Sequence, residues 1–381
     1  MTVGGEAADE VGEPPTPDSE ASGLEPDDPA AAPLELSSRH ATATTSRTTA
    51  NTSSRRTQYT REGNGPEGRI RLLMSPTLTA TNTDLWHHRC DMPHGPAYRP
   101  LVAWYDSAAR DLPWRRPGTG GWEVLVSEVM LQQTPVERVL PVYAAWLDRW
   151  PTPAALARDS VGDALRMWGR LGYPRRAARL WQAARVIDSD FEGVVPADPE
   201  ELRSLPGVGE YTAAAVAAFA YRRRTVVLDT NVRRVLARLV LGEQFPQRSL
   251  TSQEREAAER LVPDDGAQAA SWSVAAMELG ALVCTARAPR CERCPVSELC
   301  VWRAEGYPAY AGPRRAGQTY TGTDRHCRGR ILAALRSSDG PVDRETLSVS
   351  WDDAVQRERA INSLLDDGLV VQMGDSALAL P

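Results

Sequence analysis

Four cysteines in the last third of the chain have a spacing that could bind a metal centre. Cys284, Cys291, Cys294 and Cys300 form the pattern C-x6-C-x2-C-x5-C, and Pro295 follows the third of them. Four thiolates suit either a zinc ion or a 4Fe–4S cluster. Zinc ribbons usually pair two C-x2-C knuckles across a longer gap, so this single compact run predicts an iron–sulfur cluster, with zinc as the alternative. Cys90 and Cys327 lie outside the pattern and are predicted to be free thiols.

A second candidate for chemistry is Glu128, which lies inside a predicted helix at 122–133. Its neighbours one turn away are Val124, Leu125 and Leu131, and the helix has little polar face on which to expose a carboxylate. A carboxyl group among apolar side chains has a raised pKa and can stay protonated as a general acid. The alternative is a solvated glutamate on the helix surface.

Asp229 ends the apolar run at 226–228 and precedes a predicted helix at 232–241. Aspartate in this position commonly caps the helix, and a cap would hold the carboxylate ionised and fixed. A protonated acid together with a fixed carboxylate can break a glycosidic bond through an oxocarbenium-like transition state.

The stretch Leu205-Pro-Gly-Val-Gly209 lies between predicted helices at 199–205 and 211–220. Its glycines permit a tight turn with exposed backbone N–H groups, and the next helix adds the positive end of its dipole. Such a hairpin can hold a DNA phosphate, although a plain helix–helix turn could have the same sequence. Beside this hairpin, the carboxylates would act on an N-glycosidic bond of DNA, after the base is flipped out of the duplex.

The elements that must position these residues are helices. From Leu101 to Val283 apolar residues recur at helical spacing, and short loops with Gly and Pro separate the segments. This part is predicted to be all-α. The further predicted helices lie at 101–109, 161–168, 175–187, 253–261 and 267–283.

The two ends of the chain have a different character. Residues 1–95 are rich in small, polar and charged residues and are predicted to be a disordered tail. A linker at 304–323 precedes a small unit at 324–381. This unit has predicted helices at 328–336, 344–349 and 354–366 and two strands at 369–373 and 377–380, which suggest a winged-helix-like domain.

Composition limits the possible chemistry and location. The net charge of −6 arises in residues 1–50, where ten acidic residues face two arginines, so the rest of the chain could still bind an anionic partner. All 44 basic residues are arginine, which leaves no lysine to form a Schiff base. No run approaches the roughly 20 apolar residues that span a bilayer, and the N-terminus does not resemble a signal peptide. We therefore expect a cytoplasmic protein, where clustered cysteines bind metal rather than form disulfides.

Residues 98–303 resemble the helix-hairpin-helix DNA glycosylases of the adenine-excising MutY type. The resemblance implies two lobes, a six-helix barrel at about 121–220 and a 4Fe–4S cluster domain. It also implies a monofunctional base-excision-repair enzyme, expected to be monomeric and nucleoid-associated, that hydrolyses adenine from double-stranded DNA opposite 8-oxoguanine or guanine. Besides the hairpin and the cysteines, the matching stretches are Leu112-Pro-Trp-Arg115, Ser127-Glu-Val-Met-Leu-Gln-Gln-Thr134, Trp168-Gly-Arg-Leu-Gly-Tyr173 and Leu228-Asp-Thr-Asn-Val-Arg-Arg-Val235.

The resemblance also implies a role for each matching residue. Glu128 would protonate adenine and Asp229 would stabilise the sugar cation or bond to it transiently, with Tyr211 and Asn231 assisting. Gln132 would enter the duplex where the base leaves. The pocket would be lined by Trp114, Arg115 and Leu131, and further DNA contacts would come from Gln133, Thr134, Tyr173, Leu205, Pro206, Gly207, Val208 and Gly209.

The sequence departs from the family pattern in two places. Pro174 stands where an aromatic or small residue is more usual. The 79 residues after Trp302 are too few for the family's Nudix-like domain, which senses 8-oxoguanine, so we expect a winged helix to contact the duplex instead. An endonuclease III-like glycosylase and lyase is an alternative, but it uses a lysine where this chain has Tyr211. A second alternative is a DNA-binding regulator with an iron–sulfur cluster, but such a protein would give Glu128 and Asp229 no function.

Overall fold

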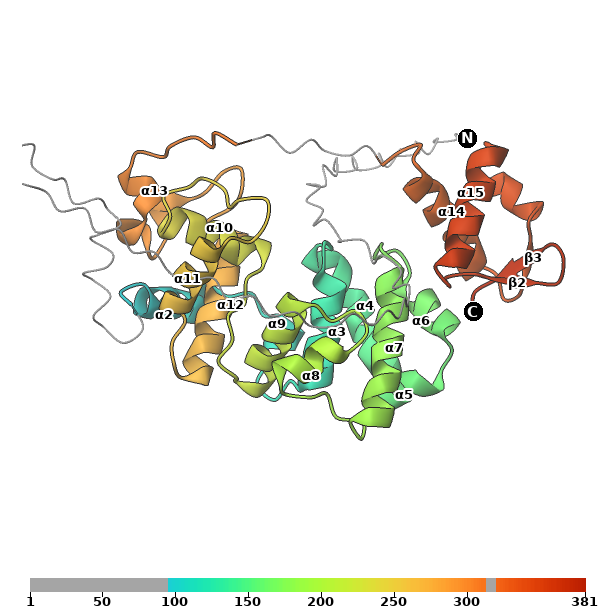
Figure 1. Ribbon diagram of the computed structural model, residues 1–381, viewed down its shortest axis with the longest axis horizontal. Coiled ribbons are helices and arrows are strands. Elements are labelled where there is room, and N and C mark those ends of the chain that lie inside the picture. Colours follow the sequence, from blue (N-terminus) through green and yellow to red (C-terminus); the bar gives the residue numbers. More distant parts are fainter. Residues whose placement is uncertain (1–94, 313–319) are drawn as a thin grey trace, which may run out of the picture. The chain divides into compact units, whose positions relative to one another are not determined.

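The computed structural model describes residues 95–312 and 320–381 (Figure 1). The predicted disordered tail lies outside the described residues, apart from Gly95, as do Cys90 and residues 313–319 of the predicted linker. Helices dominate the described part, as predicted for an all-α protein. Within that part, no helix is both long enough and apolar enough to cross a membrane.

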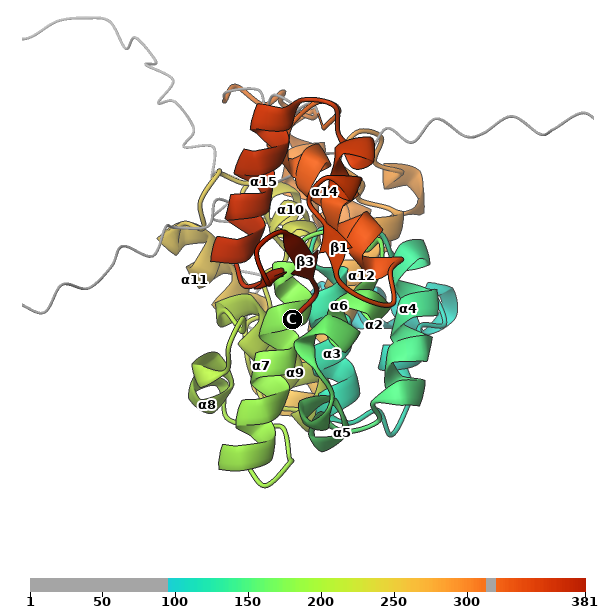
Figure 2. The same cartoon turned by 90° about the vertical axis from the view of Figure 1, so that its right-hand side faces the viewer.

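The first lobe, which was predicted to be a six-helix barrel, comprises seven helices, and tryptophans form much of its core. Trp146 is fully buried and packs edge-to-face against Trp150 and Trp168, with ring centroids 4.7 and 5.8 Å away. The central helix α3 packs against α4, α7 and α9 (Figures 1 and 2). The helices are α3 (Gly121–Leu131), α4 (Val136–Arg149), α5 (Pro153–Arg158), α6 (Val161–Trp168), α7 (Arg175–Asp190), α8 (Pro199–Ser204) and α9 (Glu210–Tyr221).

Helices α4 and α5 were not predicted from the sequence. Pro141 lies inside α4, and a proline normally marks the end of a helix because it removes a hydrogen-bond donor. Burial of Val139, Tyr143 and Trp146 on one face of α4 outweighs this local penalty.

The second lobe has its own buried core, in which α12 (Gly266–Leu282) packs against α2 (Tyr98–Ala108) and α10 (Thr230–Leu239). Trp272 and Leu279 of α12 meet Leu101 and Leu236 in this core. The remaining elements are α11 (Ser252–Leu261), the short turns η2 (Cys291–Arg293) and η3 (Ser297–Leu299), and α13 (Val301–Ala304). The segment that precedes the first lobe contains another short turn, η1 (Pro113–Arg115).

The C-terminal region has the element order of a winged helix. Strand β3 lies between β1 and β2 in an antiparallel sheet, where Leu378 pairs with both Val342 and Gln372. The sequence did not predict β1, which is only two residues long. The elements are α14 (Asp324–Arg336), β1 (Val342–Asp343), η4 (Thr346–Ser350), α15 (Ala354–Asp366), β2 (Val371–Met373) and β3 (Ala377–Ala379).

Candidate active site

Glu128 lies on α3, in the middle of the first lobe, and only 5 % of it is exposed. The hydroxyl group of Tyr211, at the start of α9, donates a hydrogen bond of 2.8 Å to Glu128 Oε2. The contact exists because α3 packs along α9, which brings together residues far apart in the sequence. Sequence reasoning linked these two side chains only through the family resemblance.

The surroundings of Glu128 favour its protonated form, as its apolar helical neighbours predicted. Burial raises the pKa of Glu128 to about 7, although the hydrogen bond from Tyr211 acts in the opposite direction. The negative charge of Asp229 also contributes to this rise in pKa, and the positive charge of Arg115 opposes it. Glu128 can therefore hold a proton near neutral pH.

Asp229 caps the N-terminus of α10, as one reading of the sequence predicted. Its Oδ1 accepts a hydrogen bond of 2.6 Å from the backbone N–H of Val232, and its Oδ2 accepts one of 2.8 Å from Asn231 Nδ2. Burial raises the pKa of Asp229, but these two hydrogen bonds oppose the shift because they stabilise the ionised carboxylate. The site therefore combines a carboxyl group that can keep its proton with a carboxylate held in one orientation.

Arg115 is fixed beside these carboxylates by Glu278 of α12, which is fully buried. Arg115 Nη1 donates to Glu278 Oε2 at 2.8 Å, and the Arg110 guanidinium donates to both carboxylate oxygens at 2.8 Å. Burial alone would raise the pKa of Glu278, but the hydrogen bonds and charges of the two arginines hold it at about 2. Sequence reasoning missed Glu278, whose only signal was an acidic residue in an otherwise apolar helix.

The predicted pocket residues Trp114 and Leu131 both pack against the core of the first lobe, Trp114 more deeply than Leu131. Trp114 is 6 % exposed and packs edge-to-face on Tyr143 at 5.1 Å, so most of its ring belongs to the core of the first lobe. Leu131, the last residue of α3, is half-buried against the same core.

The hairpin presents its backbone rather than its side chains. Leu205 and Val208 are buried, and the Val208 N–H donates to the Leu205 carbonyl oxygen at 3.1 Å to close the turn. Gly207 has φ +80°, and a Cβ there would lie 2.8 Å from Arg179 Cβ, so glycine is required. Gly209 is exposed and precedes α9, where free N–H groups are available to an anion. The half-buried Pro206 completes the turn.

The segment expected to enter the duplex follows α3 directly. Gln132 is half-buried and its Nε2 donates to Thr212 Oγ1 at 3.4 Å, whereas Gln133 is exposed. Thr134 is buried, and its hydroxyl donates to the Leu171 carbonyl oxygen at 3.3 Å.

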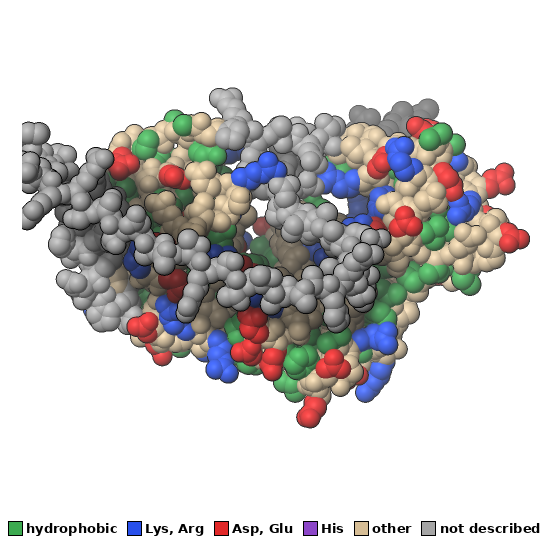
Figure 3. All heavy atoms as spheres, viewed as in Figure 1, with side chains coloured by type: hydrophobic (Ala, Val, Ile, Leu, Met, Phe, Trp, Pro, Cys, Tyr) green, Lys and Arg blue, Asp and Glu red, His purple; other side chains and the backbone are tan. Residues whose placement is uncertain are grey.

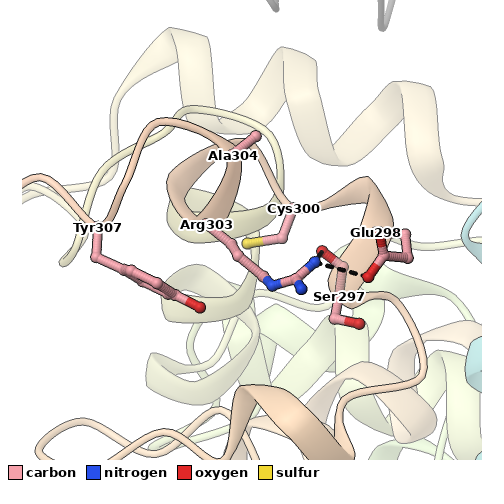
Figure 4. A pocket seen from close by; sticks show the side chains of 6 residues that line it. All are labelled: Ser297, Glu298, Cys300, Arg303, Ala304 and Tyr307. Atoms are coloured by element: carbon pink, nitrogen blue, oxygen red, sulfur yellow. Dashed lines mark hydrogen bonds and ion pairs between the residues drawn. The ribbon is translucent and has the colours of Figure 1, made fainter.

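The four cysteines of the predicted cluster site lie around the two short turns η2 and η3. Cys284, Cys294 and Cys300 pack against the core of the second lobe. Burial, together with the charges of the other three thiols, raises the pKa of Cys294 to about 12. A pocket beside Cys300 is lined by Arg303 and Tyr307, and Figure 4 shows Arg303 directed toward Glu298.

The donor set of these four thiols fits an iron–sulfur cluster, whose irons are held by cysteine thiolates. Zinc can also bind four cysteines, but its sites usually pair two C-x2-C knuckles across a longer gap. When bound to these four thiolates, the cluster would hold this loop region in one conformation.

Two buried arginines of α10 attach the cysteine region to the site. Arg238 Nη1 donates to Cys284 Sγ at 3.3 Å, which can balance thiolate charge. Arg234 donates to the Cys284 carbonyl oxygen and to Asn231 Oδ1, each at 2.8 Å, and Asn231 in turn holds Asp229. Sequence reasoning missed both arginines, although their i, i+4 spacing puts them on one helix face.

Comparison with known proteins agrees with this architecture. Residues 126–260 match the model of the HhH-GPD superfamily base excision DNA repair proteins. Residues 284–300, which begin and end at the outer two cysteines, match the iron–sulfur binding domain of endonuclease III. The bound group is therefore an iron–sulfur cluster, as predicted.

The chain is also similar over most of its length to named enzymes. It is 54 % identical to the adenine DNA glycosylase of Mycobacterium tuberculosis (strain H37Rv) over 282 residues, which are 74 % of this chain and 92 % of that protein. It is 53 % identical to the adenine DNA glycosylase of Mycolicibacterium smegmatis, covering 74 % of this chain and 94 % of that protein. Identity to the human adenine DNA glycosylase is 43 %, over 52 % of this chain and 38 % of that protein. Given these matches and the carboxylate pair beside the hairpin, the chain belongs to the adenine DNA glycosylase family of base excision repair.

Proposed function

We propose that this protein removes adenine from adenine:8-oxoguanine and adenine:guanine mispairs of double-stranded DNA, acting as a monomer on the nucleoid. The observation that carries the proposal is the group formed by Glu128, Tyr211 and Asp229 beside the hairpin. One buried carboxyl group favours its proton, and a second carboxylate is fixed at a helix N-terminus. This pairing suits a reaction in which a leaving base gains a proton while the sugar gains positive charge.

In the proposed reaction, Tyr211 donates to Glu128 Oε2, so the proton of the neutral carboxyl group resides on Oε1. Glu128 passes this proton to the adenine ring as the bond between the base and C1′ breaks. The electron pair of that bond leaves with adenine. Asp229 stabilises the resulting sugar cation, or bonds to it transiently. Water then adds at C1′ and gives up a proton to the Glu128 carboxylate, which leaves an abasic site and restores the neutral Glu128. The absence of lysine from the sequence removes the amine that a lyase step would use.

DNA binding is proposed to rely on the hairpin amides and on the segment 132–134 more than on a basic surface. Where the described residues are visible in Figure 3, arginine and acidic side chains intermingle. The proposed winged-helix domain at 324–381 has ten acidic residues and seven arginines. This excess of acidic residues does not favour phosphate binding. The charge of the domain therefore does not support the contact with the duplex that we expected from the sequence.

The proposal on the opposing base can be tested with single-turnover assays on duplexes that differ only in that base. Adenine release is expected to be fastest opposite 8-oxoguanine and guanine, and at least about tenfold slower opposite thymine. Equal rates on all three duplexes would contradict the mispair preference while leaving adenine glycosylase activity intact.

The pH profile follows from the pKa of Glu128. Because the protonated form is the active acid and its pKa is about 7, the rate should fall about tenfold per pH unit on the alkaline side. Tyr211→Phe removes a hydrogen bond that lowers this pKa, so the decline should begin at higher pH, whatever happens to the absolute rate. Single-turnover rates between pH 5 and 9 measure this, and a shift toward lower pH would contradict the assignment.

A further inference from the structure

Arg176 binds the end of the helix that carries Glu128. It is the second residue of α7, and only 9 % of it is exposed. Its Nη1 donates hydrogen bonds to the carbonyl oxygens of Val129 at 2.8 Å, Met130 at 3.1 Å and Gln132 at 2.6 Å. Carbonyl groups at a helix C-terminus lack hydrogen-bond donors within the helix. Here a single guanidinium group donates hydrogen bonds to these carbonyl groups.

The other arm of the same guanidinium binds the segment after α3 again and also the turn before α7. Arg176 Nη2 donates to Thr134 Oγ1 at 2.9 Å and to the Gly172 carbonyl oxygen at 3.2 Å. The guanidinium carbon also lies 5.4 Å from the ring centroid of Tyr173. One side chain therefore joins the segment after α3 to the turn before α7.

Both segments contain a residue with unfavourable backbone geometry. Gln133 has φ +54° and Tyr173 has φ +46°, in the left-handed region that residues with a Cβ rarely adopt. Both side chains are exposed, and both belong to the expected DNA contacts. Such backbone conformations persist only where the surroundings impose them, and they concentrate at functional sites.

The charge of Arg176 is held without an acidic partner. Its hydrogen bonds go to carbonyl and hydroxyl oxygens, and no carboxylate among the described residues forms an ion pair with it. Burial lowers the pKa of Arg176 to about 10, so it remains charged at neutral pH. The negative end of the α3 dipole compensates part of this charge. Burying a charge without an acidic partner costs free energy. Fixing the geometry of the two segments would explain why this cost is tolerated.

We infer that Arg176 is a positioning residue that holds the Gln132–Thr134 segment and Tyr173 together as one preformed wedge before DNA binds. The inference rests on the proposed function, since it assumes that these segments enter the duplex. A preformed wedge avoids ordering two strained segments during binding. Arg176 would thus act on the flipping of adenine and not on the cleavage of its bond to the sugar.

The test is a spectroscopic measurement of flipping. 2-Aminopurine replaces the target adenine opposite 8-oxoguanine, and its fluorescence rises when it leaves the base stack. Arg176→Lys keeps the charge but cannot reach both groups of oxygens with one ammonium, so the flipping equilibrium at saturating protein should fall about 10- to 100-fold. The matched control is Arg175→Lys, which changes the preceding, exposed arginine and should flip the base as wild type does.

Excision rates provide the second readout. The excision rate of Arg176→Lys should be about 10- to 100-fold below that of wild type on the paired adenine. On an adenine in an unpaired gap, where little unstacking is needed, the rate should fall by less than about threefold. Full fluorescence with Arg176→Lys, or an equal loss on both substrates, would overturn the inference. If Arg176→Lys does not fold, as judged by melting and iron content, Thr134→Val removes one contact and should reduce flipping about threefold. The fluorescence assay requires no bond cleavage. It therefore tests the role of Arg176 in base flipping even if the wild-type protein releases no adenine.

Discussion

Asp229→Asn is expected to lower the single-turnover rate of adenine release by about 1,000- to 10,000-fold, while duplex affinity stays within about threefold of wild type. The substitution conserves shape, and its amide oxygen can still accept the hydrogen bond from the Val232 N–H that caps α10. The negative charge that would stabilise the sugar cation is lost. Quantifying released adenine under enzyme excess, together with duplex binding by anisotropy, measures both quantities.

A matched control separates this electrostatic role from helix capping. Asp265 caps α12 by accepting a hydrogen bond of 2.9 Å from the Gln268 N–H, and it is exposed. Asp265→Asn should therefore leave adenine release within about threefold of wild type. If Asp229→Asn releases adenine at nearly the wild-type rate, or if Asp265→Asn loses as much, the assigned role of Asp229 is wrong.

The second large effect is expected from Cys294→Ala. Loss of one cluster ligand should abolish most iron binding, because the other thiols and Arg238 are arranged around four ligands. A bound metal centre contributes folding free energy directly, so the melting temperature should fall by about 10 °C or more. Iron analysis, visible absorbance and thermal denaturation measure these changes.

Cys327→Ala is the matched control for the cysteine experiment. Cys327 is a fully buried cysteine that lies on α14, outside the ligand pattern. Its replacement should cost about 1 kcal/mol of stability through a small cavity and leave the iron content unchanged. Retention of iron by Cys294→Ala, or its loss from Cys327→Ala, would contradict the ligand assignment.

The parts of the site that could be predicted from the sequence are those with a local signal. Apolar residues one turn from Glu128 predicted its raised pKa, and the position of Asp229 before a helix predicted its capping role. Cysteine spacing likewise predicted the cluster. Each of these inferences needs only the residues within a few positions along the chain.

The parts that could not be predicted depend on contacts between distant segments. Most partners of Arg176 lie 42 to 47 positions away along the chain, and those of Glu278 lie 163 to 168 positions away, so local sequence patterns do not predict these contacts. The hydrogen bond from Tyr211 to Glu128 spans 83 positions and follows from the packing of α3 on α9. Helix α4 was missed because its stability comes from tertiary burial despite Pro141.

The most direct test of the central claim is a product analysis on a duplex with one adenine opposite 8-oxoguanine. The protein is incubated with the duplex, and strand integrity is examined before and after alkali and with borohydride present. The account predicts release of free adenine, with a strand that stays intact until alkali is added. Strand cleavage without alkali, accompanied by a borohydride-trapped adduct, would contradict it.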